Sequence, residues 1–364
     1  MNLRLNPSLA QLPVYLPGRP IEEVARELGI PASDIIKLAS NENPFGPSPL
    51  AIAAVEKALS HANLYPDGSG FYLKQKLGTK LSVAPENLIL GNGSNDIIEF
   101  IGHALLDGES EVVVSQYCFA VYPIVTALFG ARLVTVPAKN YGHDLPAILR
   151  AITPRTKIVF VANPNNPTGT HASDAEVQQF IEAVPSHVLL AMDEAYIEFL
   201  PGALDLVPLV RTGLKPNVLL MRTFSKIYGL AGFRIGYGIS SPALISALEK
   251  IRQPFNTNLL AQTAALAALD DDEHVERTRA NNLTQLKFYE SSFRELGLEF
   301  VPSSANFILV KVGEGQRVFG ELQKAGVIVR PMAGYQLPEW IRISVGTPEE
   351  NARCIDALKK VLLR

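Results

Sequence analysis

The chain has very few cysteines, and this scarcity excludes two classes of protein. Cys118 and Cys354 are the only two in 364 residues, too few for the disulfide scaffold of a small secreted protein. The sequence also contains no Cys-x-x-Cys motif and no clustered His and Cys pairs. We therefore expect no metal site.

Long apolar runs and blocks of one charge are also missing. The net charge is −3, with no basic block, which argues against nucleic acid or an anionic membrane as the main partner. The longest apolar stretch, residues 259–269, is interrupted by polar residues and is too short to span a bilayer. Prolines at 7, 13 and 17 break any apolar core of a signal peptide. A cytoplasmic protein is the expectation.

The composition that is present is typical of a globular enzyme. Hydrophobic residues make up 47% of the chain and charged residues 19%. The length predicts about two domains. From the change of pattern after Pro254 we expect a large domain at residues 45–250, and a small α+β domain formed by residues 1–44 and 251–364.

Between residues 86 and 240, short apolar strands alternate with helical patterns. Continuous apolar strands of this kind indicate an α/β fold with a mostly parallel sheet covered on both faces. Ligands of such sheets bind beyond the carboxyl ends of the strands. The seven expected strands are 88–90, 112–114, 133–136, 158–162, 188–192, 218–221 and 235–239; further strands are expected at 306–312, 327–330 and 341–345.

The stretch from Thr223 to Tyr237 combines one lysine, hydroxyls, glycines and an arginine at the end of an expected strand. Lys226 can form an imine with an aldehyde, and Ser225 and Arg234 can hold a phosphate. Pyridoxal 5'-phosphate is an aldehyde that carries a phosphate, so Lys226 is the candidate Schiff-base residue. A surface lysine in a glycine-rich loop is the alternative for this segment alone.

Three other polar clusters follow expected strands. Gly91–Asn95 opens a helix, where free N–H groups bind anions, although a helix cap would look the same. Asn163–Gly169 offers amides to a ring hydroxyl, or forms only a tight loop. Asp193 ends an apolar strand, where a carboxylate needs a cation such as a protonated pyridine nitrogen, unless it caps the next helix.

The order of these clusters resembles the class I and II, fold-type-I pyridoxal-phosphate aminotransferases, from about Asn41 to Val345. The resemblance implies that Lys226 is the Schiff-base lysine and catalytic base, and that Asp193 is the partner of the pyridine nitrogen. It implies further cofactor contacts, namely Asn166 and Tyr196 at the ring oxygen; Gly93, Ser94, Asn95, Thr223, Ser225 and Arg234 at the phosphate; Phe119, with Tyr117 as alternative, stacked on the ring; and Tyr65 reaching across a homodimer.

Segments 14–20, 38–48 and 326–332 are similar to histidinol-phosphate aminotransferases. This likeness implies that Tyr15 and Arg330 contact a substrate phosphate and that Asn41 lies near the substrate. Arg342 resembles the arginine that holds the substrate's anionic group. The activity implied is transamination of L-histidinol phosphate with 2-oxoglutarate, a step of histidine biosynthesis.

Other activities fit parts of the same sequence. An aromatic amino acid aminotransferase would share the cofactor residues, and a lyase similar to threonine-phosphate decarboxylase would share the region around Tyr15. Asn95 stands where an acidic residue is common in the histidinol-phosphate group, so substrate choice is the open point. A non-catalytic cofactor-binding protein would leave Lys226 without a purpose.

Overall fold

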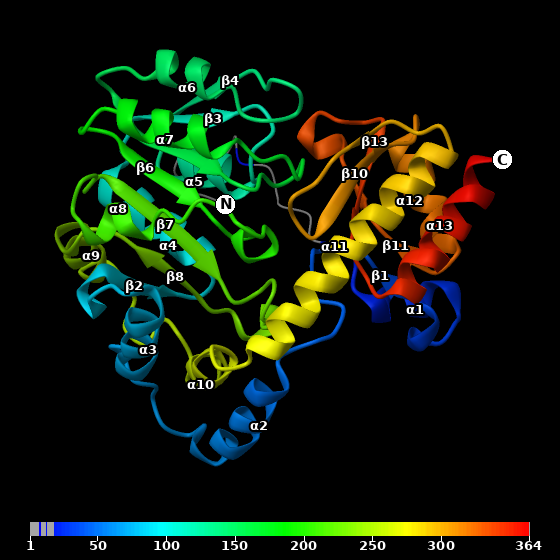
Figure 1. Ribbon diagram of the computed structural model, residues 1–364, viewed down its shortest axis with the longest axis horizontal. Helices are drawn as coiled ribbons and strands as arrows, with labels where there is room; N and C mark the ends of the chain where they lie inside the picture. The colour runs from blue at the N-terminus through cyan, green and yellow to red at the C-terminus, as the bar shows by residue number, and fades with distance from the viewer. Residues whose placement is uncertain (1–6, 9–11, 13–17, 364) are drawn as a thin grey trace, which may run out of the picture.

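A seven-stranded sheet forms the centre of the larger part of the chain. The computed structural model describes residues 7–8, 12 and 18–363. The strand order is β2-β8-β7-β6-β5-β3-β4, and only β8 runs antiparallel to its neighbours. Figure 1 shows this sheet on one side of the molecule and a smaller sheet on the other. The mostly parallel α/β fold is therefore confirmed.

The strands of the large sheet are short and almost wholly apolar. Every residue of the central strand β6 is buried, and its neighbours β5 and β7 each have only one residue that is not, as expected for parallel strands covered on both faces. Their bounds are β2 (Leu88–Gly91), β3 (Glu111–Ser115), β4 (Arg132–Val136), β5 (Thr156–Ala162), β6 (Leu189–Asp193), β7 (Val218–Thr223) and β8 (Gly236–Ile239).

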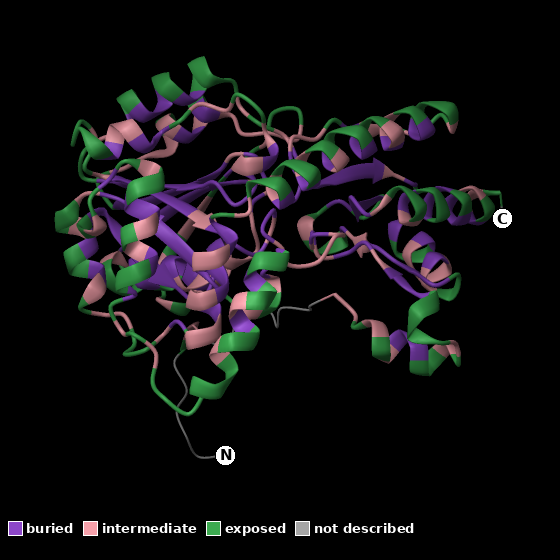
Figure 2. Ribbon diagram, turned by 60° about the horizontal axis from the view of Figure 1, so that its bottom comes forward, coloured by how far each residue is buried: buried purple, intermediate pink, exposed green. Residues whose placement is uncertain are grey.

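Successive side chains of a strand point to opposite sides of the sheet, and in these strands both sets are apolar, so helices cover both faces. Val113 belongs to one core cluster and its neighbours Val112 and Val114 to the other. Figure 2 shows the buried strands between partly exposed helices. On one face lie α2 (Pro49–Ala58), α3 (Phe71–Leu81), α6 (Leu145–Ala151), α7 (Asp174–Ala183), α8 (Val207–Arg211) and α10 (Leu259–Ala268); on the other lie α4 (Ser94–Leu105), α5 (Val121–Leu128) and α9 (Pro242–Glu249).

The smaller part is built on an antiparallel sheet with strand order β12-β13-β10-β9. Three helices pack against it around one apolar cluster. The elements are α1 (Ile21–Leu28), β1 (Ile36–Lys37), α11 (Asp272–Glu295), β9 (Phe300–Val301), β10 (Phe307–Lys311), α12 (Gly315–Lys324), β11 (Val327–Ile328), β12 (Arg330–Pro331), β13 (Trp340–Ser344) and α13 (Pro348–Leu362).

One predicted strand, residues 327–330, was wrong as a single element. Val327 and Ile328 form β11 and pair in parallel with β1, whereas Arg330 and Pro331 form β12 and pair with β13. The chain thus leaves one sheet and enters another within one residue. A run of apolar residues does not reveal such a change, because its periodicity is the same in both sheets.

The division into domains at residues 44 and 250 stays a prediction. Early residues do contact the smaller part: β1 pairs with β11, and the Ser344 amide donates to the Leu38 carbonyl over 2.8 Å. Helix α10 packs on α2 in the core of the larger part. Among the described residues, no helix is both long and apolar enough to cross a membrane.

Candidate active site

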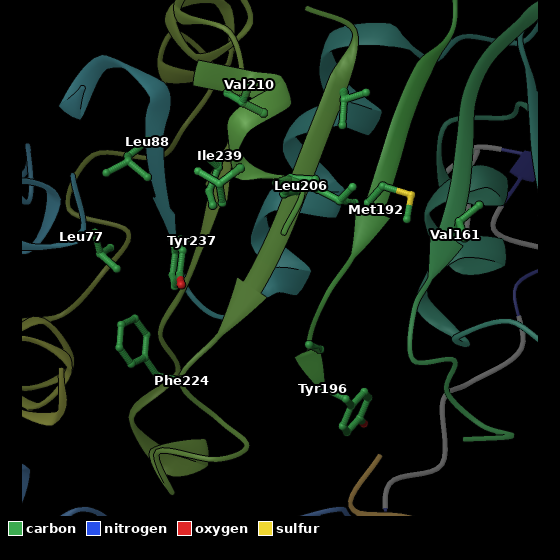
Figure 3. Packing of buried hydrophobic residues seen from close by; sticks show 14 of the residues in the cluster. Leu77, Leu88, Val161, Met192, Tyr196, Leu206, Val210, Phe224, Tyr237 and Ile239 are labelled. Carbon is green, nitrogen blue, oxygen red and sulfur yellow. The ribbon is translucent and has the colours of Figure 1, made fainter. Parts of the chain in front are cut away.

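A cavity of about 270 Å³ lies where the larger and smaller parts meet, and the ends of three parallel strands contribute residues to its wall. Ala162, Asp193 and Thr223 are the last residues of β5, β6 and β7, and all three line it. Figure 3 shows Tyr196 just beyond the end of β6, below Met192. The sheet therefore gathers polar side chains that lie far apart in the sequence at one edge.

One end of the cavity is suited to an anion. Ser94 begins the twelve-residue helix α4, and Gly93 before it has φ +80°. The Arg234 guanidinium donates to the Ser225 hydroxyl over 3.3 Å. A Cβ at Gly93 would lie 2.5 Å from that guanidinium, so only glycine lets the arginine approach the helix start. Helix N–H groups, a hydroxyl and a guanidinium together make a phosphate cradle.

Lys226 follows β7 by three residues and points into the same cavity. Its Nζ lies 3.4 Å from the Ser40 carbonyl and 5.6 Å from the centre of the Tyr196 ring. Burial, the largest cause, acts together with the nearby Arg342 and Arg234 to lower the pKa of Lys226 to about 8, although its acidic neighbours partly oppose them. A substantial fraction of the amine is thus neutral near physiological pH, as a nucleophile requires.

Asp193 is only 5% exposed, and its carboxylate accepts a hydrogen bond from the Tyr122 hydroxyl over 2.6 Å. Within the described residues no Lys, Arg or His nitrogen lies within 4.0 Å of it. Burial raises the pKa of Asp193, and the Tyr122 hydrogen bond only partly opposes this. A cation placed against such a carboxylate offsets the energetic cost of burying its negative charge.

Amides and hydroxyls connect the cavity to the smaller part. The Asn41 amide donates to the Tyr196 hydroxyl over 2.9 Å, and the Ser344 hydroxyl donates to Asn41 Oδ1 over 2.9 Å. Arg342 donates to Asn166 Oδ1 over 2.6 Å. Asn41 has φ +56°, a left-handed conformation that asparagine tolerates better than most residues. These contacts join strand ends of one sheet to β13 of the other.

Arg330 and Arg342 stand directly opposite each other in the antiparallel pair of β12 and β13. Both line the cavity, and Arg342 is 7% exposed. Like charges at directly paired positions are destabilising unless something offsets the repulsion. An anion bound between the two guanidinium groups would do so, and a phosphate can accept hydrogen bonds from both.

Most of the predicted site residues lie together. Those that line the cavity are Lys226, Asp193, Ser94, Asn95, Phe119, Asn166, Tyr196, Thr223, Ser225, Arg234, Asn41, Arg330 and Arg342. Gly93 does not line it but precedes α4. Tyr65 is 83% exposed and lies outside it, stacked on Phe255 with ring centres 4.8 Å apart. Tyr15 lies outside the described residues.

The two aromatic residues between which the sequence left the choice open lie in different places. Phe119 lines the cavity, whereas Tyr117 stacks on Tyr141 with ring centres 6.1 Å apart and is absent from the wall. The sequence missed Tyr122, which contacts Asp193, and Tyr335, which lines the cavity. Neither had a signal in the sequence, because each depends on a contact between distant segments.

The residues present fit pyridoxal 5'-phosphate. The buried Asp193 carboxylate offers the partner that a protonated ring nitrogen needs, and the cradle at α4 offers a phosphate site. Lys226, on the same wall, has a lowered pKa, as imine formation requires. Among the described residues no group of three or more His, Cys, Asp or Glu is placed to hold a metal ion.

Comparisons with known proteins agree with this chemistry. The sequence profile of "Aminotransferase class I and II" matches residues 33–358. A histidinol-phosphate aminotransferase of Akkermansia muciniphila is 52% identical over 98% of each chain, and histidinol-phosphate aminotransferase 2 of Pseudomonas fluorescens is 50% identical over 98% of this chain and 97% of its own. The crystal structure of histidinol-phosphate aminotransferase from Sinorhizobium meliloti with pyridoxal-5'-phosphate superposes with a TM-score of 0.88 at 31% identity, covering 99% of this chain and 98% of the other.

Proposed function

The chain belongs to the class I and II aminotransferase family, and from this premise we propose that its amino donor is L-histidinol phosphate. The amino group passes to 2-oxoglutarate, which gives imidazole acetol phosphate and glutamate, a step of histidine biosynthesis. Pyridoxal 5'-phosphate is the cofactor, and it supplies the electron sink for this exchange. The protein's own residues bind, orient and move protons.

The pair of facing arginines is the observation that carries the choice of substrate. Arg330 and Arg342 are directly opposite across β12 and β13, and both line the cavity. One site must accept the phosphate ester of the donor and the carboxylate of glutamate in turn. Guanidinium groups bind either anion with two hydrogen bonds, and a dianionic phosphate offsets the repulsion of two cations more fully.

The remaining roles follow from the positions of the side chains. We assign Lys226 as the base that moves the proton at the reacting carbon, because its lowered pKa leaves it partly neutral near pH 7. Asp193 holds the ring nitrogen in its protonated form. The cradle of Ser94, Ser225 and Arg234 would anchor the cofactor phosphate, and Asn166 and Tyr196 would orient its ring oxygen.

Substrate selectivity tests the proposal most directly. We expect purified enzyme to transaminate histidinol phosphate with a higher kcat/KM than phenylalanine, and to release no carbon dioxide from threonine phosphate. All three compounds should be assayed on one sample, with glutamate formed from 2-oxoglutarate and carbon dioxide released as the two readouts. A preference for phenylalanine would replace the assignment with an aromatic aminotransferase, and carbon dioxide release would replace it with a lyase.

Arg330→Ala should lower kcat/KM for histidinol phosphate more than for phenylalanine. Loss of one hydrogen bond to a charged group costs about 1.5–3 kcal/mol, which lowers kcat/KM by roughly tenfold to a hundredfold. Arg342→Ala should lower kcat/KM for every acidic substrate, glutamate included, since we expect Arg342 to bind both the phosphate and the carboxylate. Equal losses for the two donors in Arg330→Ala would contradict a phosphate-binding role for this residue.

We also propose that the active unit is a homodimer. Exposed apolar side chains are concentrated in residues 50–72, and Phe255 joins them by stacking on Tyr65. An ordered turn presents Tyr65: the Asp67 carboxylate accepts from the Phe71 amide over 2.7 Å, and Arg252 donates to the Gly68 carbonyl over 2.8 Å. A fixed, exposed tyrosine within apolar surface suits a contact with a second copy.

If Tyr65 completes the partner's site, two inactive variants should complement each other. Mixed Tyr65→Ala and Lys226→Ala subunits should recover up to about a quarter of wild-type activity, since half of a random mixture is heterodimer with one intact site of two. The control replaces Lys226→Ala with the double variant, which leaves no intact site. Activity no higher than in this control, under proven subunit exchange, would show that the tyrosine is not shared.

The cytoplasm is the compartment that we propose. Both cysteines are buried and free, as in proteins of a reducing environment.

A further inference from the structure

The loop between β1 and α2 contains a contact that the roles above do not use. This loop, residues 38–48, runs alongside the segment 226–229 that carries the catalytic lysine. The side-chain amide of Asn43 donates to the Ile227 carbonyl over 2.7 Å, and the backbone N–H of Ser48 donates to the Tyr228 carbonyl over 3.3 Å. A Cβ at Gly229, which has φ +70°, would lie 2.0 Å from the Gly46 carbonyl oxygen. The two backbones are therefore as close as glycine permits.

Asn43 is 8% exposed and hydrogen-bonded on every side. Besides the Ile227 carbonyl, its Nδ2 lies 3.1 Å from the Thr278 hydroxyl and 3.2 Å from His274 Nε2. Its Oδ1 accepts from the Phe45 amide over 2.9 Å. One amide hydrogen is thus directed at the lysine segment and the other at helix α11.

Helix α11 extends from the larger part to the smaller part (Figure 1). Arg279 on this helix donates to the Glu198 carbonyl over 2.8 Å, and one turn later Asn282 donates to the Ala305 carbonyl over 3.1 Å. Residue 198 follows β6, and residue 305 precedes β10. Asn43 therefore connects the lysine segment to the helix that joins the two parts.

We propose that Asn43 is a positioning residue that fixes Lys226 in the active site and couples its position to α11. The loop holds the lysine at two points: Asn43 holds the backbone at Ile227, and the Ser40 carbonyl lies 3.4 Å from Nζ. The inference rests on the proposed role of Lys226 as the residue that binds the cofactor.

Loss of the Asn43 contact should change the electrostatic environment of the lysine nitrogen. Burial and the neighbouring arginines disfavour a positive charge there. A looser segment admits water, and water stabilises the charged form. In the enzyme loaded with cofactor, loss of the Asn43 contact should therefore raise the pKa of this nitrogen.

The test is an absorbance titration of the loaded enzyme against pH, with and without Asn43→Ala. We expect the pKa of the bound cofactor's visible band to rise by about half a unit or more, and kcat to fall by about fivefold with KM changed less than about twofold. Thr278→Val removes one anchor of Asn43 but keeps the contact with Ile227, and should shift the pKa in the same direction by less. This variant keeps the test valid if Asn43→Ala does not fold.

Asn87→Ala is a matched control. Asn87 is 7% exposed, and its Nδ2 donates to the Ser240 carbonyl over 2.7 Å at the opposite edge of the large sheet. This variant should lose similar thermal stability and leave the cofactor pKa unchanged. An unchanged pKa in both Asn43→Ala and Thr278→Val, or an equal shift in Asn87→Ala, would overturn the inference. The titration needs no substrate, so its outcome is separate from whether histidinol phosphate is the donor.

Discussion

Replacing Lys226 with alanine should lower turnover by about 10²-fold to 10⁴-fold, the usual contribution of a positioned general base. The loss follows because no other lysine lines the cavity among the described residues. The protein should still fold and hold the cofactor through Asp193 and the phosphate cradle. Single-turnover absorbance with histidinol phosphate measures the chemical step without interference from product release.

A chemical label checks the same assignment on the wild-type enzyme. Borohydride reduction should attach the cofactor to the peptide that contains Lys226, and to no other. Lys250→Ala is a suitable control, because Lys250 is exposed at the end of α9. A labelled peptide that lacks Lys226, or near wild-type turnover in Lys226→Ala, would show that a different residue binds the cofactor.

Asp193→Asn should reduce kcat by roughly a hundredfold to several thousandfold, from the 3–5 kcal/mol typical of removing one partner of a buried ion pair. The amide is nearly the same size, so the fold should persist. It carries no charge and cannot stabilise a proton on the ring nitrogen. The cofactor should still bind through its phosphate, which an absorbance spectrum of the purified variant reveals.

Tyr122→Phe separates the charge of Asp193 from its hydrogen bond. This variant removes the hydroxyl that donates to the carboxylate over 2.6 Å but keeps the negative charge. We expect a loss of about tenfold, smaller than in Asp193→Asn. Equal losses in the two variants would mean that Asp193 acts through its orientation and not through its charge.

Several features could be predicted from the sequence because they depend on neighbouring residues. Strand and helix patterns repeat over a few positions, and glycine, proline and asparagine mark where a strand ends. Residues 188–192 were predicted as a strand, and β6 lies at Leu189–Asp193. Lys226 and Asp193 could be selected for the same reason: each is a polar residue at the end of an apolar run.

The contacts that complete the site join segments far apart in the chain. Tyr122 reaches Asp193 across 71 positions, and Asn43 reaches Ile227 across 184. Arg330 faces Arg342 only because the chain changes from β11 to β12 within one residue and pairs antiparallel with β13. No local pattern encodes these pairings, because they depend on how the two sheets and α11 pack together.

The sequence by itself therefore determined the α/β class and the polar residues at the strand ends, since both rest on local periodicity and residue type, and its resemblance to the aminotransferases implied the cofactor chemistry. Only the tertiary structure decided that Phe119 and not Tyr117 lines the cavity, that Asp193 is held by Tyr122, and that the two arginines stand side by side. These outcomes depend on side-chain packing and strand register, which are properties of the whole chain.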